Sequence, residues 1–184
     1  MQQITRRMYH PAPDFPAWAT QFIMDGRRAE VLMVVRDTRG DVWLHRKGDQ
    51  PWRLPTGTLE RGEEPTVGLA REVGEEFGAS LPLVRALAVL QVEMDVPGVP
   101  GVFTSHIFLL DGGGYVPVPI ADERIAAWRT FSIRDLYGVA TCLRALTATA
   151  GLDGWRWPYW GAFRALEHEL VADVLAAEPI RPLN

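Results

Sequence analysis

The chain has 184 residues, 47% of them hydrophobic, and a formal net charge of −4 at pH 7. This length suits one domain with a buried core, and the negative charge argues against nucleic-acid partners, which favour proteins with a basic face. The chain contains no signal-peptide pattern and no stretch near the ~18 apolar residues of a membrane span. A single cysteine, Cys142, excludes an internal disulfide and fits a reducing compartment, so we expect a cytoplasmic protein without membrane partners.

The N-terminal part of the chain is rich in proline. Pro11, Pro13 and Pro16 fall within the first 20 residues, which we therefore predict to be irregular. Residues 1–28 are accordingly assigned to an N-terminal arm. Residues 29–36 and 41–46 are rich in β-forming side chains and are separated by the turn sequence DTRG, so we predict a β-hairpin there.

A helix is predicted at about residues 65–77. Pro65 suits the first turn of a helix, where its missing N–H costs nothing, and Gly78 suits the position just after the end. At about 100° per residue, three glutamates fall on one exposed face and four apolar residues fall on the opposite face, where they can pack on a sheet. The acidic face consists of Glu72, Glu75 and Glu76, and the apolar face of Val67, Ala70, Val73 and Phe77.

This helix also contains features that a purely structural helix would avoid. Interior glycines cost about 0.5–1 kcal/mol relative to alanine. Gly68 falls among the glutamates, where it leaves room for a ligand, and Gly74 falls on the apolar side, where it would allow close backbone approach. The three like charges repel one another. A hard divalent cation, which prefers oxygen ligands, would offset that repulsion; the alternative is a solvated acidic surface.

Three further strands are predicted at about residues 86–94, 102–110 and 126–131. Ser132 and Asp135 have the spacing of a capping box that begins a short helix. Strands on both sides of the acidic helix, followed by a closing helix, predict an α/β protein with an α/β/α sandwich around a mixed β-sheet.

The C-terminal part is predicted to be largely helical. Residues 139–149 suit one helix that ends at Gly151, and an amphipathic helix follows that stops before Pro179. The segment from Trp155 to Trp160 is unusually aromatic, which leaves three interpretations open: packing under the last helix, a homodimer contact, or stacking on a nucleobase. Residues 151–184 are thus expected to form an aromatic loop and a helix packed on the same domain.

Residues 57–79 carry the most specific pattern in the chain. They read GTLERGEEPTVGLAREVGEEFGA, with the spacing G-x5-E-x7-R-E-U-x-E-E-x-G-U, where U is an aliphatic residue. This pattern resembles the Nudix box, the signature of enzymes that hydrolyse a nucleoside diphosphate linked to another group X. The resemblance extends over about residues 29–137 and implies a Nudix hydrolase domain at residues 29–150. Ala79 is smaller than the usual aliphatic, and Thr56 stands where the family often has a second glycine, but neither departure removes a functional group.

The resemblance implies roles for the matched residues. Three glutamates, Glu72, Glu75 and Glu76, would bind Mg²⁺, or Mn²⁺ in its place, together with the backbone carbonyl of Gly57. Glu72 is also the candidate for polarising the attacking water. By the same resemblance, the other two charged box residues, Arg71 and Glu63, orient these carboxylates. The reaction implied is hydrolysis of the pyrophosphate bond to NMP and P–X.

An acid in a later loop of the family often serves as an extra metal ligand or a general base. Glu123, or failing that Asp122, is the candidate here, with a solvated loop acid as the alternative. Three consecutive glycines at 112–114 suggest a hinge, so we expect this acid to approach only once nucleotide and metal are bound. Glu93, at a predicted strand end, is a weaker candidate for the same role.

Basic side chains beside the box are candidates for contacts with substrate phosphates. Arg46 and Arg53 flank the loop that enters the box, and solvent exposure is the alternative for both. The strand residues His45 and His106 are more typical of structural than of catalytic histidines.

The identity of X stays open at the level of sequence. The prolines after the box, Pro97 and Pro100, do not match the spacing typical of ADP-ribose hydrolases, so ADP-ribose, a nucleotide sugar and an NTP all remain candidates. The expected partner is a small nucleoside diphosphate derivative. The alternative function is a Nudix-fold module that binds a nucleotide without turning it over. The isopentenyl diphosphate isomerase branch depends on an active-site cysteine, whereas Cys142 lies far from the box.

Overall fold

The computed structural model describes residues 1–9, 15–23, 28–96, 98, 101–146 and 157–177. The strands are β1 (Gln2–Tyr9), β2 (Ala29–Asp37), β3 (Val42–Lys47), β4 (Thr56–Thr58), β5 (Leu83–Asp95), β6 (Val102–Gly113) and β7 (Ile125–Phe131). The helices are α1 (Phe15–Phe22), α2 (Pro65–Phe77), α3 (Asp135–Arg144) and α4 (Trp157–Ala176).

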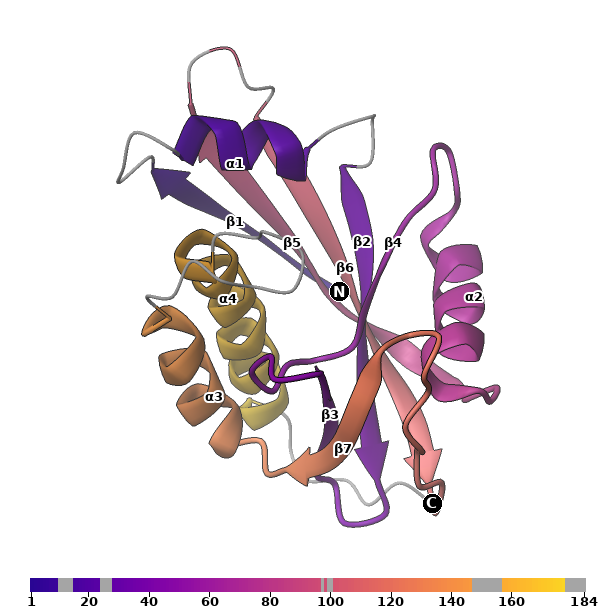
Figure 1. Cartoon of the computed structure of the whole chain (residues 1–184). Coiled ribbons are helices and arrows are strands. Elements are labelled where there is room, and N and C mark those ends of the chain that lie inside the picture. Colours follow the sequence, from indigo (N-terminus) through magenta and orange to yellow (C-terminus); the bar gives the residue numbers. More distant parts are fainter. Residues whose placement is uncertain (10–14, 24–27, 97, 99–100, 147–156, 178–184) are drawn as a thin grey trace.

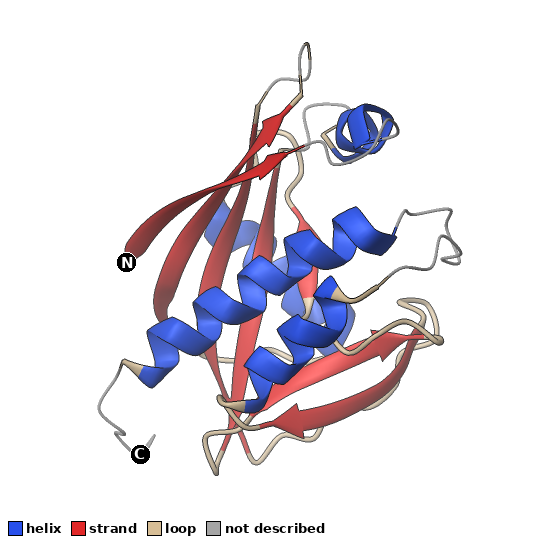
Figure 2. Ribbon diagram, turned by 90° about the vertical axis from the view of Figure 1, so that its left-hand side faces the viewer, coloured by secondary structure: helices blue, strands red, loops and turns tan. Residues whose placement is uncertain are grey.

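A mixed β-sheet forms the centre of the molecule. Six strands follow the order β1-β5-β6-β2-β3-β7, and β4 pairs with β2 outside this path. Helix α2 covers one face, and α3 and α4 cover the other (Figures 1 and 2). The predicted α/β/α sandwich is therefore confirmed, as is the predicted hairpin, whose strands are β2 and β3. The strands predicted at about residues 86–94 and 102–110 are β5 and β6, which pair in antiparallel orientation.

The N-terminal residues form regular structure, so the prediction of an irregular arm was wrong for the described part. Strand β1 pairs in parallel with β5 along its whole length. Phe15 of α1 is fully buried and packs edge to face on Tyr159 of α4, with ring centroids 4.9 Å apart. Pro16 lies in the first turn of α1, where proline is tolerated. The local proline signal could not show that β1 completes a sheet with a strand far along the chain.

Strand β2 has a separate apolar core on each of its faces, because successive side chains of a strand point in opposite directions. Val31, Met33 and Val35 pack with α2 in one core. Leu32 and Val34 belong to the larger core on the other face, which includes residues of α1, α3 and α4. Strand β2 is therefore buried on both faces. It pairs with β4, which carries Gly57, and α2 packs on one of its faces.

Helix α2 has the predicted bounds but a different buried face. Gly78 ends it with φ 65°, a left-handed conformation that glycine adopts at low cost. Leu69 is buried, whereas Val67 is 60% exposed and Ala70 is also exposed, so the predicted apolar face is rotated. Among the described residues, no atom beyond the adjacent residues and the backbone of α2 lies within 4 Å of a Cβ placed on Gly74, so close backbone approach by these residues does not explain this glycine.

The region after β7 contains one helix where two were predicted. Ser132 and Asp135 form a reciprocal capping box, with each side chain accepting from the other's backbone N–H. The helix that follows, α3, runs continuously from Asp135 to Arg144 through the expected break. Residues 147–149 of the predicted second helix lie outside the described residues.

The aromatic segment is partly helical rather than a loop, because α4 begins at Trp157. Tyr159 and Trp160 are 8% and 7% exposed and belong to the larger core, which favours packing among the three interpretations. Trp155 lies outside the described residues. Within the ranges that the structure describes, no helix combines the length and apolar character needed to cross a bilayer.

Candidate active site

An acidic cavity of about 300 Å³ lies between α2, β4 and the loop before β7. Five carboxyl groups and only two cations contribute to its wall. These side chains are Glu60, Glu72, Glu75, Glu76, Glu123, Lys47 and Arg71. The cavity thus collects most of the predicted site residues and carries an excess of negative charge.

Gly57 brings the backbone of β4 against a carboxyl group of α2. It pairs with Val31 of β2, and a Cβ on Gly57 would lie 1.8 Å from Cδ of Glu72. No other residue fits without moving Glu72, which gives a physical reason for glycine at this position. The two predicted metal ligands, the Gly57 backbone and the Glu72 carboxylate, are therefore in contact range of one another.

Gly68 has a similar steric role one turn before these acids. A Cβ there would lie 2.2 Å from Cδ2 of Leu59 and 3.0 Å from Oε2 of Glu63. The glycine therefore lets the loop before α2 fold down onto the helix. It does not itself leave space for a ligand, which corrects the sequence interpretation.

Arg71 connects the loop and the helix. Its Nε donates to Glu63 Oε1 at 3.1 Å and its Nη2 donates to Glu63 Oε2 at 2.9 Å. Its Nη1 donates to Glu72 Oε1 at 2.7 Å and to Glu75 Oε2 at 3.1 Å. The hydrogen bond from Arg71 is the main cause that holds the pKa of Glu63 below its ordinary value. Arg71 and Glu63 thus sit where the predicted orienting residues should sit.

Two of the three box carboxylates are buried, although the sequence indicated an exposed acidic face. Glu72 is 8% exposed and Glu76 is 1% exposed. Burial raises the pKa of Glu72, and it raises the pKa of Glu76 to about 7 against the opposing effect of Lys47. Glu76 Oε2 has no hydrogen-bond partner among the described residues. A buried carboxylate oxygen without a partner is costly, so this atom is poised for a ligand.

Lys47 is a site residue that the sequence analysis missed. Its Nζ lies 3.1 Å from Glu76 Oε1 and 3.4 Å from Glu123 Oε2. The signal was available, since Lys47 is the single lysine of the chain and strand periodicity places it on the same face of β3 as His45. Lys47, and not its neighbour Arg46 as predicted, therefore places a positive charge at the cavity.

Glu123 lines the cavity, whereas Asp122 is exposed and does not. The loop before it is held by Trp128, whose Nε1 donates to the carbonyl of Val118 at 3.0 Å, and Tyr115 donates to the carbonyl of Phe77. Because Glu123 already contacts Lys47, no loop closure is needed to bring it to the site. Its role as ligand or base stays a prediction.

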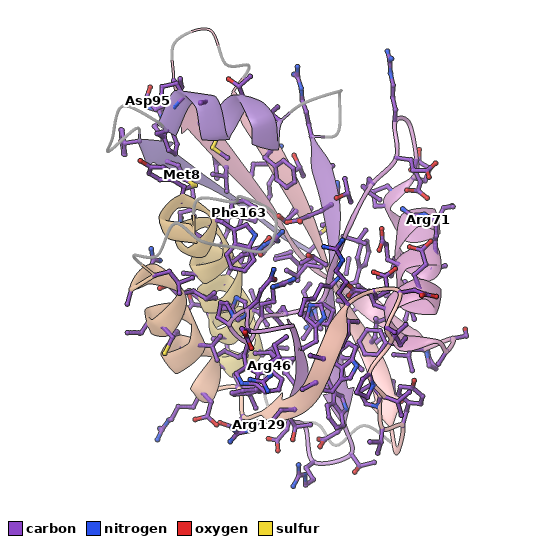
Figure 3. All side chains as sticks on the ribbon, in the orientation of Figure 1. Met8, Arg46, Arg71, Asp95, Arg129 and Phe163 are labelled. Carbon is purple, nitrogen blue, oxygen red and sulfur yellow. The ribbon has the colours of Figure 1, made fainter. Side chains whose placement is uncertain are left out.

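The structure does not bring Arg46 and Arg53 to the cavity wall. Arg46 packs on Trp52, with its guanidinium 5.4 Å from the ring centroid, and Figure 3 shows it on the α3–α4 side while Arg71 lies on α2. Arg53 is 8% exposed and lies over Trp160, and burial lowers its pKa to about 10. Their contacts with phosphate stay predictions.

Two other candidates from the sequence, Glu93 and His45, have contacts that suit a role in the fold. Glu93 forms an ion pair with Arg7 of β1 at 2.6 Å, outside the cavity. His45 is 1% exposed and stacks on Trp128 with centroids 5.3 Å apart, and burial keeps its pKa well below the ordinary value. Such an uncharged, enclosed imidazole suits the structural interpretation.

The donor set of the cavity fits a hard divalent cation. Its carboxylate oxygens are the ligand type that Mg²⁺ prefers, and Glu76 Oε2 and the close Gly57–Glu72 contact are features that a ligand would use. In the part of the chain that is described, no three acidic, histidine or cysteine side chains already converge as a metal cluster. Arg71 instead bridges Glu72 and Glu75, and Lys47 bridges Glu76 and Glu123.

Comparison with known proteins gives one family. The NUDIX domain matches residues 26–150. An RNA pyrophosphohydrolase from Psychrobacter arcticus is 29% identical over 163 residues, which cover 82% of this chain and 87% of that protein. An RNA pyrophosphohydrolase from Yersinia pestis is 27% identical over 173 residues, covering 86% of this chain and 91% of that protein.

Solved structures show the same fold. The dihydroneopterin triphosphate pyrophosphohydrolase of E. coli matches with a TM-score of 0.52 at 17% identity, covering 82% of this chain and 97% of that chain. A UDP-X diphosphatase matches with a TM-score of 0.51 at 18% identity, covering 88% of this chain and 71% of that chain.

Proposed function

The chain belongs to the NUDIX family, and we propose that it is a metal-dependent hydrolase that splits a nucleoside diphosphate linked to X into NMP and P–X. The observation that carries this proposal is the open cavity in which the box carboxylates outnumber the cations, with a buried oxygen of Glu76 left without a partner. A pyrophosphate needs its charge neutralised before a nucleophile can approach phosphorus, and this cavity has the groups to hold the neutralising ion.

The residues of the chain divide the work of hydrolysis among them. One water adds across the P–O–P linkage: its oxygen bonds to phosphorus, the bridging P–O bond breaks, and a proton passes to a base. Burial raises the pKa of Glu72, so its carboxylate is a stronger base than an exposed one and can accept that proton. Arg71 and Glu63 orient the carboxylates, and Lys47 lies where it can contact a phosphate.

We propose Mg²⁺ as the ion, with Mn²⁺ as a substitute, held by Glu72, Glu75, Glu76 and the carbonyl of Gly57. Such an ion polarises phosphoryl oxygens and lowers the pKa of a bound water. The single test is a panel of substrates with millimolar Mg²⁺, scored by release of NMP from the nucleotides and by release of pyrophosphate or phosphate from a 5′-triphosphorylated RNA. The expected result is turnover of at least one substrate, abolished by EDTA. No release from any of them would overturn the proposal.

The panel should contain a nucleotide sugar, ADP-ribose, an NTP and a 5′-triphosphorylated RNA. The RNA is included because two relatives are named RNA pyrophosphohydrolases, although the net charge of −4 argues against nucleic-acid binding. A module that binds a nucleotide without hydrolysis is the alternative, and it would show binding by calorimetry without NMP release. The cytoplasmic location and a homodimer stay predictions.

A further inference from the structure

A second cavity, of about 410 Å³, adjoins the acidic one. The two share Leu59 and Glu60, in the loop between β4 and α2. The second cavity reaches from this loop to the beginnings of β2 and β6, where Val102, Thr104 and His106 form its floor. Chain segments that are far apart in sequence therefore line a second depression, which shares two residues with the proposed site of hydrolysis.

The second cavity differs from the first in charge. Its arginines are the exposed Arg28 and Arg61, and neither guanidinium group has a hydrogen bond or ion pair with another described residue. Of its two carboxyl groups, Glu63 is already occupied by Arg71, which leaves Glu60 against two free guanidinium groups. Partial burial lowers the pKa of His106, so its ring is neutral near pH 7 and can donate or accept a hydrogen bond.

Free guanidinium groups in a depression bind oxyanions such as phosphate, because the planar guanidinium presents paired N–H donors to two oxygens. A phosphate chain whose scissile bond lies in the acidic cavity can continue over Leu59 and Glu60 into the second one. We propose that the second cavity binds the phosphate groups of X through Arg28 and Arg61. This proposal rests on the function proposed above and extends it to the substrate class.

The consequence is a preference among substrates. When X is phosphate or polyphosphate, the leaving half carries charge that Arg28 and Arg61 can meet. When X is a neutral sugar, it has no charged group that Arg28 and Arg61 could bind. The protein should therefore act more efficiently on nucleoside triphosphates and longer polyphosphates than on nucleotide sugars.

The test compares the wild type with Arg28→Gln, Arg61→Gln and the double variant, using ATP and a nucleotide sugar as substrates. For ATP, each single variant should raise KM by about tenfold, the effect expected of a lost charge-assisted hydrogen bond, with kcat nearly unchanged. For the nucleotide sugar, KM should change less than about twofold. Arg61→Lys, which keeps the positive charge, should raise the KM for ATP less than Arg61→Gln does.

Two controls make the outcome decisive. Arg129→Gln removes an exposed arginine of β7 at the other end of the molecule (Figure 3) and should leave both KM values unchanged. Calorimetry with inorganic tripolyphosphate in EDTA measures binding without catalysis, and the double variant should bind it at least about tenfold more weakly than wild type.

Each outcome separates the two proposals. Weaker tripolyphosphate binding by the double variant, together with a wild type that hydrolyses nothing, would support the anion site and remove the proposed function. Equal tripolyphosphate binding by wild type and double variant would overturn the anion site and leave hydrolysis intact. An equal rise in KM for ATP and for the sugar would also overturn it, because the arginines would then not distinguish X.

Discussion

Two clusters of arginine and glutamate lie on opposite faces of the central sheet, and they differ in how completely their charges are matched. On the α4 side, Arg164 Nη1 lies 2.9 Å from Glu30 Oε1 and 2.9 Å from Glu167 Oε2. Ser105 Oγ lies 2.7 Å from Glu30 and 2.8 Å from Glu167. On the α2 side, Arg71 contacts Glu63, Glu72 and Glu75 beside an open cavity that Glu76 also lines.

The α4-side cluster is buried and its carboxyl oxygens all have partners, whereas Arg164 Nε has none among the described residues. Ser105 has one hydroxyl hydrogen but two carboxyl neighbours, so one neighbour must supply a proton. Burial raises the pKa of Glu167 well above its ordinary value, which favours the protonated form of this carboxyl group. On the α2 side, Glu76 Oε2 has no partner among the described residues. A matched, closed cluster serves the fold, whereas a surplus of carboxylate at an open cavity serves a ligand.

The largest expected effect is the loss of the buried cation. Arg164→Met should lower the free energy of unfolding by about 3–5 kcal/mol, because Glu30 would be left buried without a counter-charge. Arg71→Met should cost less than about 1 kcal/mol, since its ion pairs are partly exposed. Urea unfolding of both variants measures the difference. Equal losses would show that the two clusters do not differ as described.

Substitutions on the α2 side should lower the activity more than substitutions on the α4 side, the reverse of their effects on stability. Glu72→Gln and Glu76→Gln should each lower kcat at least about a hundredfold, because each removes one charge from the proposed metal site. Glu167→Gln should change kcat less than about threefold, since glutamine resembles its protonated carboxyl group. Steady-state kinetics at saturating Mg²⁺ gives the comparison. Near wild-type turnover by Glu76→Gln would contradict the role given to the α2-side cluster.

Glu123 and Asp122, which are neighbours in the loop before β7, allow a comparison at the open cavity. Glu123→Gln should lower kcat by about 10–100-fold, because Glu123 contacts Lys47 at the cavity and Lys47 contacts Glu76. Asp122→Asn is the matched control, and its exposed side chain should leave kcat unchanged. If both variants keep full activity, Glu123 is only a surface acid.

The smallest effect is a pH dependence of the metal-free protein. Burial raises the folded-state pKa of Glu76 to about 7, above its unfolded value, so the folded state holds the proton more tightly. Stability from this group is therefore fully present at low pH and is lost as pH rises through about 7. Between pH 6 and 8 the loss should be about 1 kcal/mol in EDTA. Chemical unfolding at both pH values measures it, and Glu76→Gln should remove that part of the difference.

The sequence was sufficient where the signal is local. Pro65 and Gly78 mark the ends of α2 correctly, and Ser132 with Asp135 forms the predicted capping box, because these features depend on neighbouring backbone groups. The resemblance to the Nudix box implied a shared role for Arg71 and Glu63, and their side chains are hydrogen-bonded to one another. The family and the α/β/α fold followed from such patterns.

The sequence failed where the outcome depended on distant partners. The pairing of β1 with β5 and the burial of Phe15 required contacts that no local pattern shows. The same holds for Val67, which stays exposed because α2 is rotated on the sheet. Local proline content and helix periodicity describe a segment alone, whereas these results depend on the surface that receives it.

The sequence by itself determined that Glu72, Glu75 and Glu76 lie along one side of α2 and line one cavity, because helix geometry fixes the relation of residues three and four positions apart. Only the tertiary structure decided that Lys47, rather than Arg46, meets these carboxylates, since that depends on which face of β3 turns toward α2. It also decided that Glu76 is buried and that Arg28 and Arg61 share a cavity. Burial and contacts between distant segments arise only when the chain packs. They determine the charge of the site and which residues line it.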